Sequence, residues 1–215
     1  MKRKVTLSFP SPRGSRSKEV MVNVTSPYRA VKIARGLWQN LPFGDHNPHA
    51  EQLIGEIMPI HNVDGLRDIS QIVTMANNIQ RETHILEKDA LPNIKLVLAP
   101  NNRLLLFDGH HSLLAYYANG RQTLQEIPHL ILSTHDSLPV TAVEISFFFP
   151  ADARNQIVSN WERYAVNWQA PIGQQIENRQ LNSMAELAAA FHERHSADLG
   201  SKIRPKNSFV ESASQ

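Results

Sequence analysis

Several absences narrow what this chain can be. The sequence has no cysteine, which removes disulfides, thiol nucleophiles and thiolate metal ligands together. No apolar run approaches the roughly 18 residues that a membrane span requires, so we expect no membrane segment. The basic start Lys2–Lys4 precedes an apolar stretch, Val5–Phe9, that is too short for a signal peptide. Together these features favour a cytoplasmic protein.

Common catalytic loops are missing as well. The sequence contains no Gly-Lys-Ser/Thr phosphate loop, no dinucleotide-binding glycine fingerprint and no Gly-x-Ser-x-Gly elbow. The usual nucleotide-binding folds and ordinary serine hydrolases are therefore not expected. His192 and His195 are three residues apart, whereas a zinc helix needs a spacing of four, so we expect them on a solvated helix face.

Charge is unevenly placed along the 215 residues. Residues 1–40 hold nine Lys or Arg and one acid, Glu19, which is about +8, although the whole chain is only +2. A basic segment of this kind can bind nucleic acid or another polyanion. Alternatively, it is a solvated terminus or docks on the acidic remainder of the protein. The length suits one large domain, or a core domain with appended segments.

Hydrophobic periodicity predicts an α/β (α+β) fold in which a small mixed sheet is packed with helices. Residues 1–50 are expected to form a basic hairpin, from Val5–Phe9 and Glu19–Val24, and a helix beginning at Ser26-Pro27. Residues 151–199 are expected to be a helical extension with helices at Asp152–Trp168 and Leu181–His195. The polar residues 200–215 are expected to be disordered.

Residues 51–150 are expected to form the central domain. The elements predicted there are a strand at Glu56–Ile60, a helix at Leu66–Thr83, a hairpin of Lys95–Leu98 with Leu104–Phe107, a helix at His110–Asn119 ended by Gly120, and strands at Pro128–Leu132 and Thr141–Phe149.

The passage from the second hairpin strand into the next helix is the best candidate for a functional site. A helix N-terminus presents unpaired backbone amides that favour an anion such as phosphate. Gly109 has no Cβ to obstruct a ligand, and the side chains of His110, His111 and Ser112 can donate to phosphate oxygens. Asp108 could hold Mg²⁺ or accept a hydroxyl proton. The alternative is that Asp108 only caps the helix and that one histidine is a core residue.

The run Leu104–Ala115, followed by Gly120 and Ile127-Pro128, resembles the ParB/sulfiredoxin superfamily. It is most similar to the ParB-like branch with an Asp-Gly-His-His signature, which includes free serine kinases and proteins described as ParB-like nucleases. The resemblance covers Glu56–Leu132, about a third of the chain. It implies a small α/β domain whose Gly-His-His turn binds nucleotide phosphates, with Asp108 as a catalytic residue.

The resemblance also implies partners for Asp108. Glu56 is the best match for an assisting acid, with Glu51 and Asp64 as competitors, and His110 completes the expected catalytic set. His61 falls where relatives carry a polar residue after a proline. The implied ligands are a nucleotide (ATP, ADP or CTP), Mg²⁺ held by Asp108 through that nucleotide, and a small hydroxyl-bearing substrate.

One position departs from the family pattern. Relatives usually have Arg after Gly-His-His, and this chain has Ser112, which lacks the fixed charge and the bidentate fork that grip phosphate. Arg103 or Arg121 could substitute in space. Sulfiredoxin activity itself is excluded, because its cysteine is absent.

Three functions follow from these observations. The first is a nucleotide-dependent phosphotransferase or nucleotide hydrolase, which the sequence favours. The second is a DNA-associated ParB-like partition protein or nuclease that uses basic residues 1–40. The two tail helices are about a dozen residues apart, too far for a helix-turn-helix, which weighs against it. The third is a catalytically inactive scaffold, favoured by Ser112.

Overall fold

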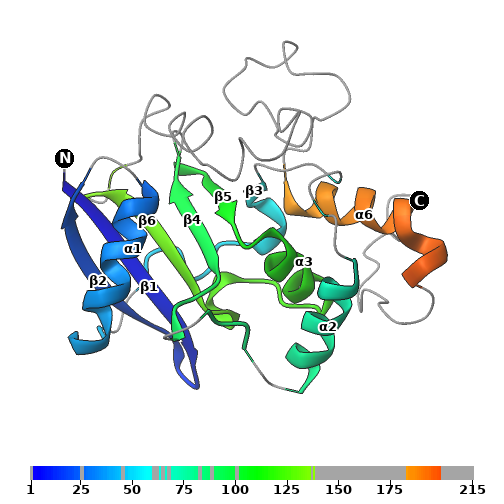
Figure 1. The fold of residues 1–215 in the computed structure, drawn as a ribbon, viewed down its shortest axis with the longest axis horizontal. Helices are drawn as coiled ribbons and strands as arrows, with labels where there is room; N and C mark the ends of the chain where they lie inside the picture. The colour runs from blue at the N-terminus through cyan, green and yellow to red at the C-terminus, as the bar shows by residue number, and fades with distance from the viewer. Residues whose placement is uncertain are drawn as a thin grey trace, which may run out of the picture.

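The computed structural model describes residues 2–24, 27–44, 47–59, 63, 66, 69–81, 84–87, 90–99, 102–136, 138 and 183–199. Its strands are β1 (Lys2–Ser11), β2 (Gly14–Asn23), β3 (Met58–Pro59), β4 (Ile94–Leu98), β5 (Leu104–Asp108) and β6 (His129–Thr134) (Figure 1). Its helices are α1 (Pro27–Leu37), α2 (Ile69–Gln80), α3 (His110–Ala118) and α6 (Met184–Leu199), and its short 3-10 turns include η1 (Trp38–Asn40), η2 (Ile54–Glu56) and η6 (Leu124–Glu126).

The strands form one mixed sheet with the order β2-β1-β6-β4-β5-β3. The pairs β1–β2, β1–β6 and β4–β5 are antiparallel, whereas β4–β6 and β3–β5 are parallel. The predicted α/β fold class is confirmed. Because Val5 pairs with Leu132, the N-terminal hairpin is part of the same sheet as the central strands.

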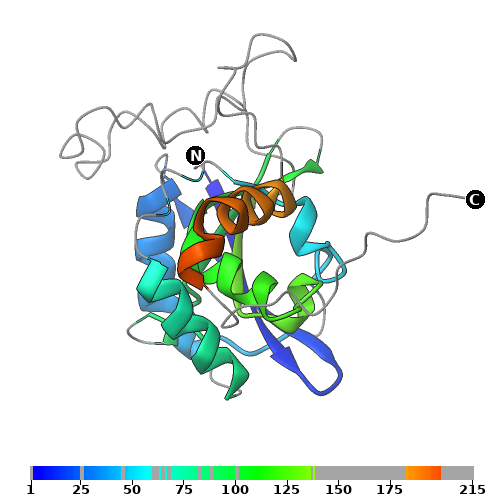
Figure 2. The ribbon, with the colours of Figure 1, turned by 90° about the vertical axis from the view of Figure 1, so that its right-hand side faces the viewer.

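Helices cover both faces of the sheet, which gives three layers (Figures 1 and 2). Successive strand residues point to opposite faces. Accordingly, Val97 and Leu105 join the core beneath α1, whereas Leu96 and Leu106 join the core shared with α2, α3 and α6. Figure 2 shows these last three helices together in front of the sheet. Gly109 connects the end of β5, in the sheet, to the start of α3, in the helical layer that covers this face.

Most central elements lie where periodicity predicted them. The β4–β5 hairpin and α3 are confirmed, and Gly120 ends α3 with a φ of +80°. The strand predicted at Glu56–Ile60 is only two residues long in the described part of the chain, and Glu56 belongs to η2. After α1 the chain turns into η1, which buries Trp38, whereas Leu37 at the end of α1 is 47% exposed.

The C-terminal helix packs onto the central domain. Its first residue, Met184, donates its backbone N–H to the Ile57 carbonyl at 2.8 Å. Ser183 caps the helix through its Oγ, which accepts the Glu186 N–H at 3.2 Å, and the helix begins three residues after the predicted start at Leu181. The elements predicted at 141–149 and 152–168 lie outside the described residues. No helix in the described ranges is both long and apolar enough to cross a bilayer.

A buried polar network joins β1, β6 and the segment around Asn47. His129 is fully buried; its Nδ1 lies 2.9 Å from the Ile127 carbonyl and its Nε2 2.8 Å from Asn47 Nδ2. Asn47 Nδ2 also donates to Ser8 Oγ at 2.8 Å. An amide nitrogen carries two hydrogens and accepts none, so its second N–H donates to His129 Nε2. His129 is therefore a neutral imidazole with its proton on Nδ1. Burial is the main cause that lowers its pKa to about 4.

Candidate functional site

The turn between β5 and α3 requires glycine at position 109. Gly109 has a φ of +89°, which side chains with a Cβ rarely adopt. A Cβ at this position would lie 2.6 Å from the Asn93 carbonyl oxygen and 2.9 Å from the Ile94 Cα. We predicted that the missing Cβ would admit a ligand, but the backbone that leads into β4 occupies that space. Gly109 thus sets the packing of the turn.

Asp108 lies at the end of β5 with its carboxylate held from two sides. Its Oδ1 accepts the Gly109 N–H at 2.9 Å, and its Oδ2 lies 2.8 Å from Lys95 Nζ. The side chain is still 34% exposed. The N-cap of α3 is Gly109, which makes no side-chain capping hydrogen bond, so Asp108 does not act as the predicted helix cap. Its carboxylate is oriented and also accessible to solvent.

Lys95 is the partner that sequence reasoning missed. A register shift between Lys95 and Leu96 pairs Lys95 directly with Asp108, which brings both side chains to one face. The Lys95 side chain is only 5% exposed. Its ammonium donates to Asp108, to Glu87 Oε1 and to the Asn93 carbonyl, the last at 3.3 Å. These acceptors match the three donors of the ammonium, which is what burying a charge requires.

The ion-pair network continues to α1. Glu87 Oε2 pairs with Arg35, whose guanidinium projects from α1. Two bases and two acids therefore alternate in the order Arg35, Glu87, Lys95, Asp108. The network ties the basic N-terminal segment to the Asp108 turn. The available sequence signal was a single lysine in the otherwise apolar strand Ile94–Leu98.

The first turn of α3 is mostly interior. His110 is 5% exposed, which fits the alternative that one of the two histidines is a core residue. His111 is half-buried, and its Nε2 atom is covered. Ser112 is fully buried; its Oγ accepts from Asn93 Nδ2 and lies 3.6 Å from Met75 Sδ. The Ser112 hydroxyl therefore packs beneath α2 and does not face a ligand outside the turn.

Glu56 and Arg103 lie near the start of β5, whereas Asp108 lies at its end. Because β3 runs parallel to β5 with Met58 opposite Leu105, Glu56 lies near the start of β5. Strand rise along β5 places Arg103 about 16 Å from Asp108. Glu56 accepts a hydrogen bond from Gln52 Nε2 at 2.8 Å and does not meet Asp108. Glu87, which reaches Asp108 through Lys95, is the nearby acid instead.

Arg121 is also remote from the turn, because it follows the C-terminal end of α3. The nine residues of α3 separate it from Gly109 by about 14 Å along the helix axis. Arg121 cannot take the place, at the turn, of the arginine that the ParB-like proteins of the resemblance carry after Gly-His-His, and the bases near Asp108 are Lys95 and Arg35. Predicted site residue His61 and competitor Asp64 lie outside the described residues, and Glu51 is exposed.

A magnesium site would rest on Asp108. Within the described ranges no three His, Asp or Glu side chains gather into a metal cluster. Mg²⁺ usually takes one or two carboxylates and completes its shell with substrate phosphates and water. One accessible, oriented carboxylate fits that requirement when a nucleotide supplies the phosphates. Asp108 therefore fits as a single protein ligand.

Comparisons with protein-family models, with curated proteins and with solved structures found no match to this chain. The resemblance to the ParB/sulfiredoxin superfamily thus rests on the Asp-Gly-His-His run and the order of elements around it.

Proposed function

We propose that this protein is a nucleotide-dependent phosphotransferase or nucleotide hydrolase whose reaction takes place at Asp108. The observation that carries the proposal is the Asp108 carboxylate, which two fixed donors orient and which remains accessible to solvent. It lies at a strand end, immediately before a helix N-terminus without a side-chain cap. Strand ends of this kind, next to helix N-termini, are common positions for phosphate-binding sites.

In the proposed reaction, Asp108 accepts the proton of the attacking hydroxyl or water. Lys95 acts as a positioning residue, because its ammonium fixes one carboxylate oxygen and offsets the charge of the network. The positive end of the α3 dipole favours the nucleotide phosphates. Mg²⁺, when bound with the nucleotide, neutralises the charge on the phosphates. The phosphate acceptor is a small molecule with a hydroxyl group.

Calorimetry with ATP, ADP and CTP in the presence of Mg²⁺ tests the proposal. We expect binding of at least one nucleotide, and nucleotide turnover when serine or another small hydroxyl compound is added. Asp108→Asn should abolish turnover, since an amide does not accept the proton. Asp136→Asn is the matched control, because Asp136 is exposed and pairs only with His135 among the contacts that the structure records. No binding at millimolar nucleotide, or full turnover in Asp108→Asn, would contradict the proposal.

Nucleic-acid binding is the second candidate. Of the nine bases in residues 1–40, Arg3 and Lys18 are buried, and Lys4 and Arg35 form ion pairs. The exposed bases that remain are Lys2, Arg13, Arg16, Arg29 and Lys32. Five phosphate contacts would give a dependence of log affinity on log salt of about −4. A gel shift with that salt slope supports this candidate, and no shift at low salt removes it.

A further inference from the structure

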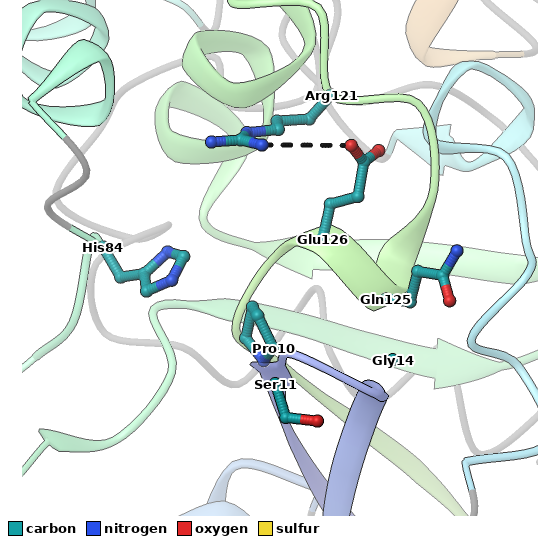
Figure 3. A pocket seen from close by; sticks show the side chains of 7 residues that line it. All are labelled: Pro10, Ser11, Gly14, His84, Arg121, Gln125 and Glu126. Carbon is teal, nitrogen blue, oxygen red and sulfur yellow. Dashed lines mark ion pairs between the residues drawn. The ribbon is translucent and has the colours of Figure 1, made fainter.

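A cavity of about 530 Å³ lies at the C-terminal end of α3, away from Asp108. It is lined by the β1–β2 turn, by His84 and by three residues of the segment around η6, Arg121, Gln125 and Glu126 (Figure 3). Its volume is in the range of small-molecule sites. The residues that line it are mostly polar, so hydrogen-bonding and charged groups decide what it can bind.

Arg121 is placed at this cavity by the way α3 ends. Gly120 donates to the Tyr117 carbonyl at 2.9 Å and Arg121 donates to the Tyr116 carbonyl at 3.2 Å, which together form a Schellman motif. These bonds occupy carbonyls at the negative end of the helix dipole. The chain then projects the Arg121 side chain along the cavity on the His84 side (Figure 3). The backbone geometry thus fixes the Arg121 Cα at the rim of the cavity and the direction in which its side chain leaves the chain.

The Arg121 guanidinium keeps donors available for a ligand. Its nearest recorded acid is Glu126, with Nη1 and Oε1 3.9 Å apart, which is beyond hydrogen-bond range. Glu126 is already engaged, because its Oε2 accepts the backbone N–H of Thr123 at 2.8 Å and that of Gln122. The Arg121 charge is therefore only loosely balanced, and its side chain is 38% exposed.

His84 adds a second donor to the same wall. The Tyr116 hydroxyl accepts the Ile85 N–H at 2.9 Å and lies 3.3 Å from His84 Nδ1, so the hydroxyl proton is directed to that nitrogen. Burial, and then the charge of Arg121, lower the pKa of His84, which favours the neutral ring. A neutral ring whose Nδ1 accepts carries its proton on Nε2. His84 Nε2–H is therefore a hydrogen-bond donor at the cavity.

We infer that this cavity binds the oxyanion group, phosphate or carboxylate, of a small molecule between Arg121 and His84. A planar guanidinium is the side chain best matched to such a group, and the His84 N–H supplies a further donor. The Gln125 side chain and Ser11 line the remaining space, where they can contact the rest of the ligand. This is a second ligand site, independent of the proposed reaction at Asp108.

Histidine NMR tests the inference with inorganic phosphate and acetate as probes, at constant ionic strength kept with sodium chloride. The His84 imidazole signal is assigned from its loss in His84→Gln. We expect that signal to shift with saturation, and Arg121→Gln to weaken the affinity at least about tenfold, as expected for loss of a charge-assisted pair. Saturation with phosphate alone identifies a phosphate ligand, and saturation with acetate as well extends the site to carboxylates.

Two control variants make the outcome decisive. Arg29→Gln, which removes an exposed base on α1 outside the cavity lining, should bind like the unaltered protein. Asp108→Asn should also leave the His84 response unchanged, which separates this site from the proposed reaction. The inference is overturned if neither phosphate nor acetate saturates the shift of the His84 signal by about 50 mM. It is equally overturned if a folded Arg121→Gln protein, checked by its thermal melting, responds like the unaltered one.

Discussion

Low pH should lower the free energy of unfolding of this protein through one buried side chain, His129. In the folded state its Nδ1–H and Nε2 are both satisfied by hydrogen bonds only when the ring is neutral. Protonation would place a second N–H against the Asn47 amide donor in a fully buried position. In the unfolded chain the imidazole takes up a proton freely near the ordinary histidine pKa of 6.5. Folding therefore competes with protonation of His129 as the pH falls.

The size and the pH range of the effect follow from the two pKa values. The pKa of His129 falls from 6.5 in the unfolded chain to about 4 in the folded protein. At about 1.4 kcal/mol per unit, protonation costs the folded state about 3 kcal/mol relative to the unfolded state. The unfolded state binds more protons between these values, so stability rises with pH there. The contribution is complete above pH 6.5 and is lost as the pH falls to about 4.

Urea unfolding followed by tryptophan fluorescence, at several pH values between 7 and 4, measures this contribution. We expect the unaltered protein to lose about 3 kcal/mol more over this range than His129→Gln, which cannot titrate. His84, whose pKa is also lowered by burial, is present in both proteins and cancels in the comparison, whereas the charge of His49 contributes to the lowered pKa of His129 and belongs to the measured difference. His135→Gln is the control at an exposed position. If the stability of His129→Gln falls as steeply as that of the unaltered protein, the assignment to His129 is wrong.

Four further substitutions test, by urea unfolding, the packing at the site and in the buried network around His129. Gly109→Ala should cost about 3 kcal/mol or more, since its Cβ meets the Asn93 backbone, whereas Gly120→Ala, with a similar φ but nothing within 4 Å, should cost only about 1 kcal/mol. Equal costs would refute the close approach. Lys95→Met should cost about 3 kcal/mol, because two partly buried carboxylates lose their shared partner, and an unchanged urea midpoint would contradict this. Asn47→Ala should cost about 2 kcal/mol and flatten the pH dependence, because it removes the donor to His129.

The sequence was sufficient to predict elements whose signals are local. The apolar runs of β4 and β5, the Asp108-Gly109 turn and Gly120 after α3 depend on residues within one turn or strand, so they could be identified from a single sequence. The same reasoning predicted a helix over residues 181–195, and the structure has one from Met184 to Leu199. From the sequence, Gly109 was expected to give a ligand access to the turn. The structure shows that it is needed for packing, because the atoms that exclude a Cβ there belong to Asn93 and Ile94, in a different segment.

The composition of the site could not be read from the sequence, because its contacts join distant segments. Arg35 meets Glu87 across 52 positions, and Lys95 meets Asp108 across 13. The second of these contacts also needs the register shift in the β4–β5 pair, which no residue pattern predicts. Glu56 was preferred as the assisting acid because it was the best match to the resemblance, at the start of the strand predicted at Glu56–Ile60, but the parallel pairing of β3 with β5 places it near the opposite end of β5 from Asp108.

Lys95 explains why an accessible carboxylate can persist at this turn. Two carboxylates near one another repel, and each would otherwise be stabilised by taking up a proton. The buried ammonium between Glu87 and Asp108 removes that conflict, and Arg35 balances the second acid. Asp108 is thereby held in one orientation while its outer surface stays open. The arginine that the ParB-like proteins of the resemblance carry at the position of Ser112 has no equivalent inside this network. We therefore expect any phosphate group to depend on the α3 N-terminus and on Mg²⁺, and phosphate binding to weaken strongly when the metal is removed by chelation.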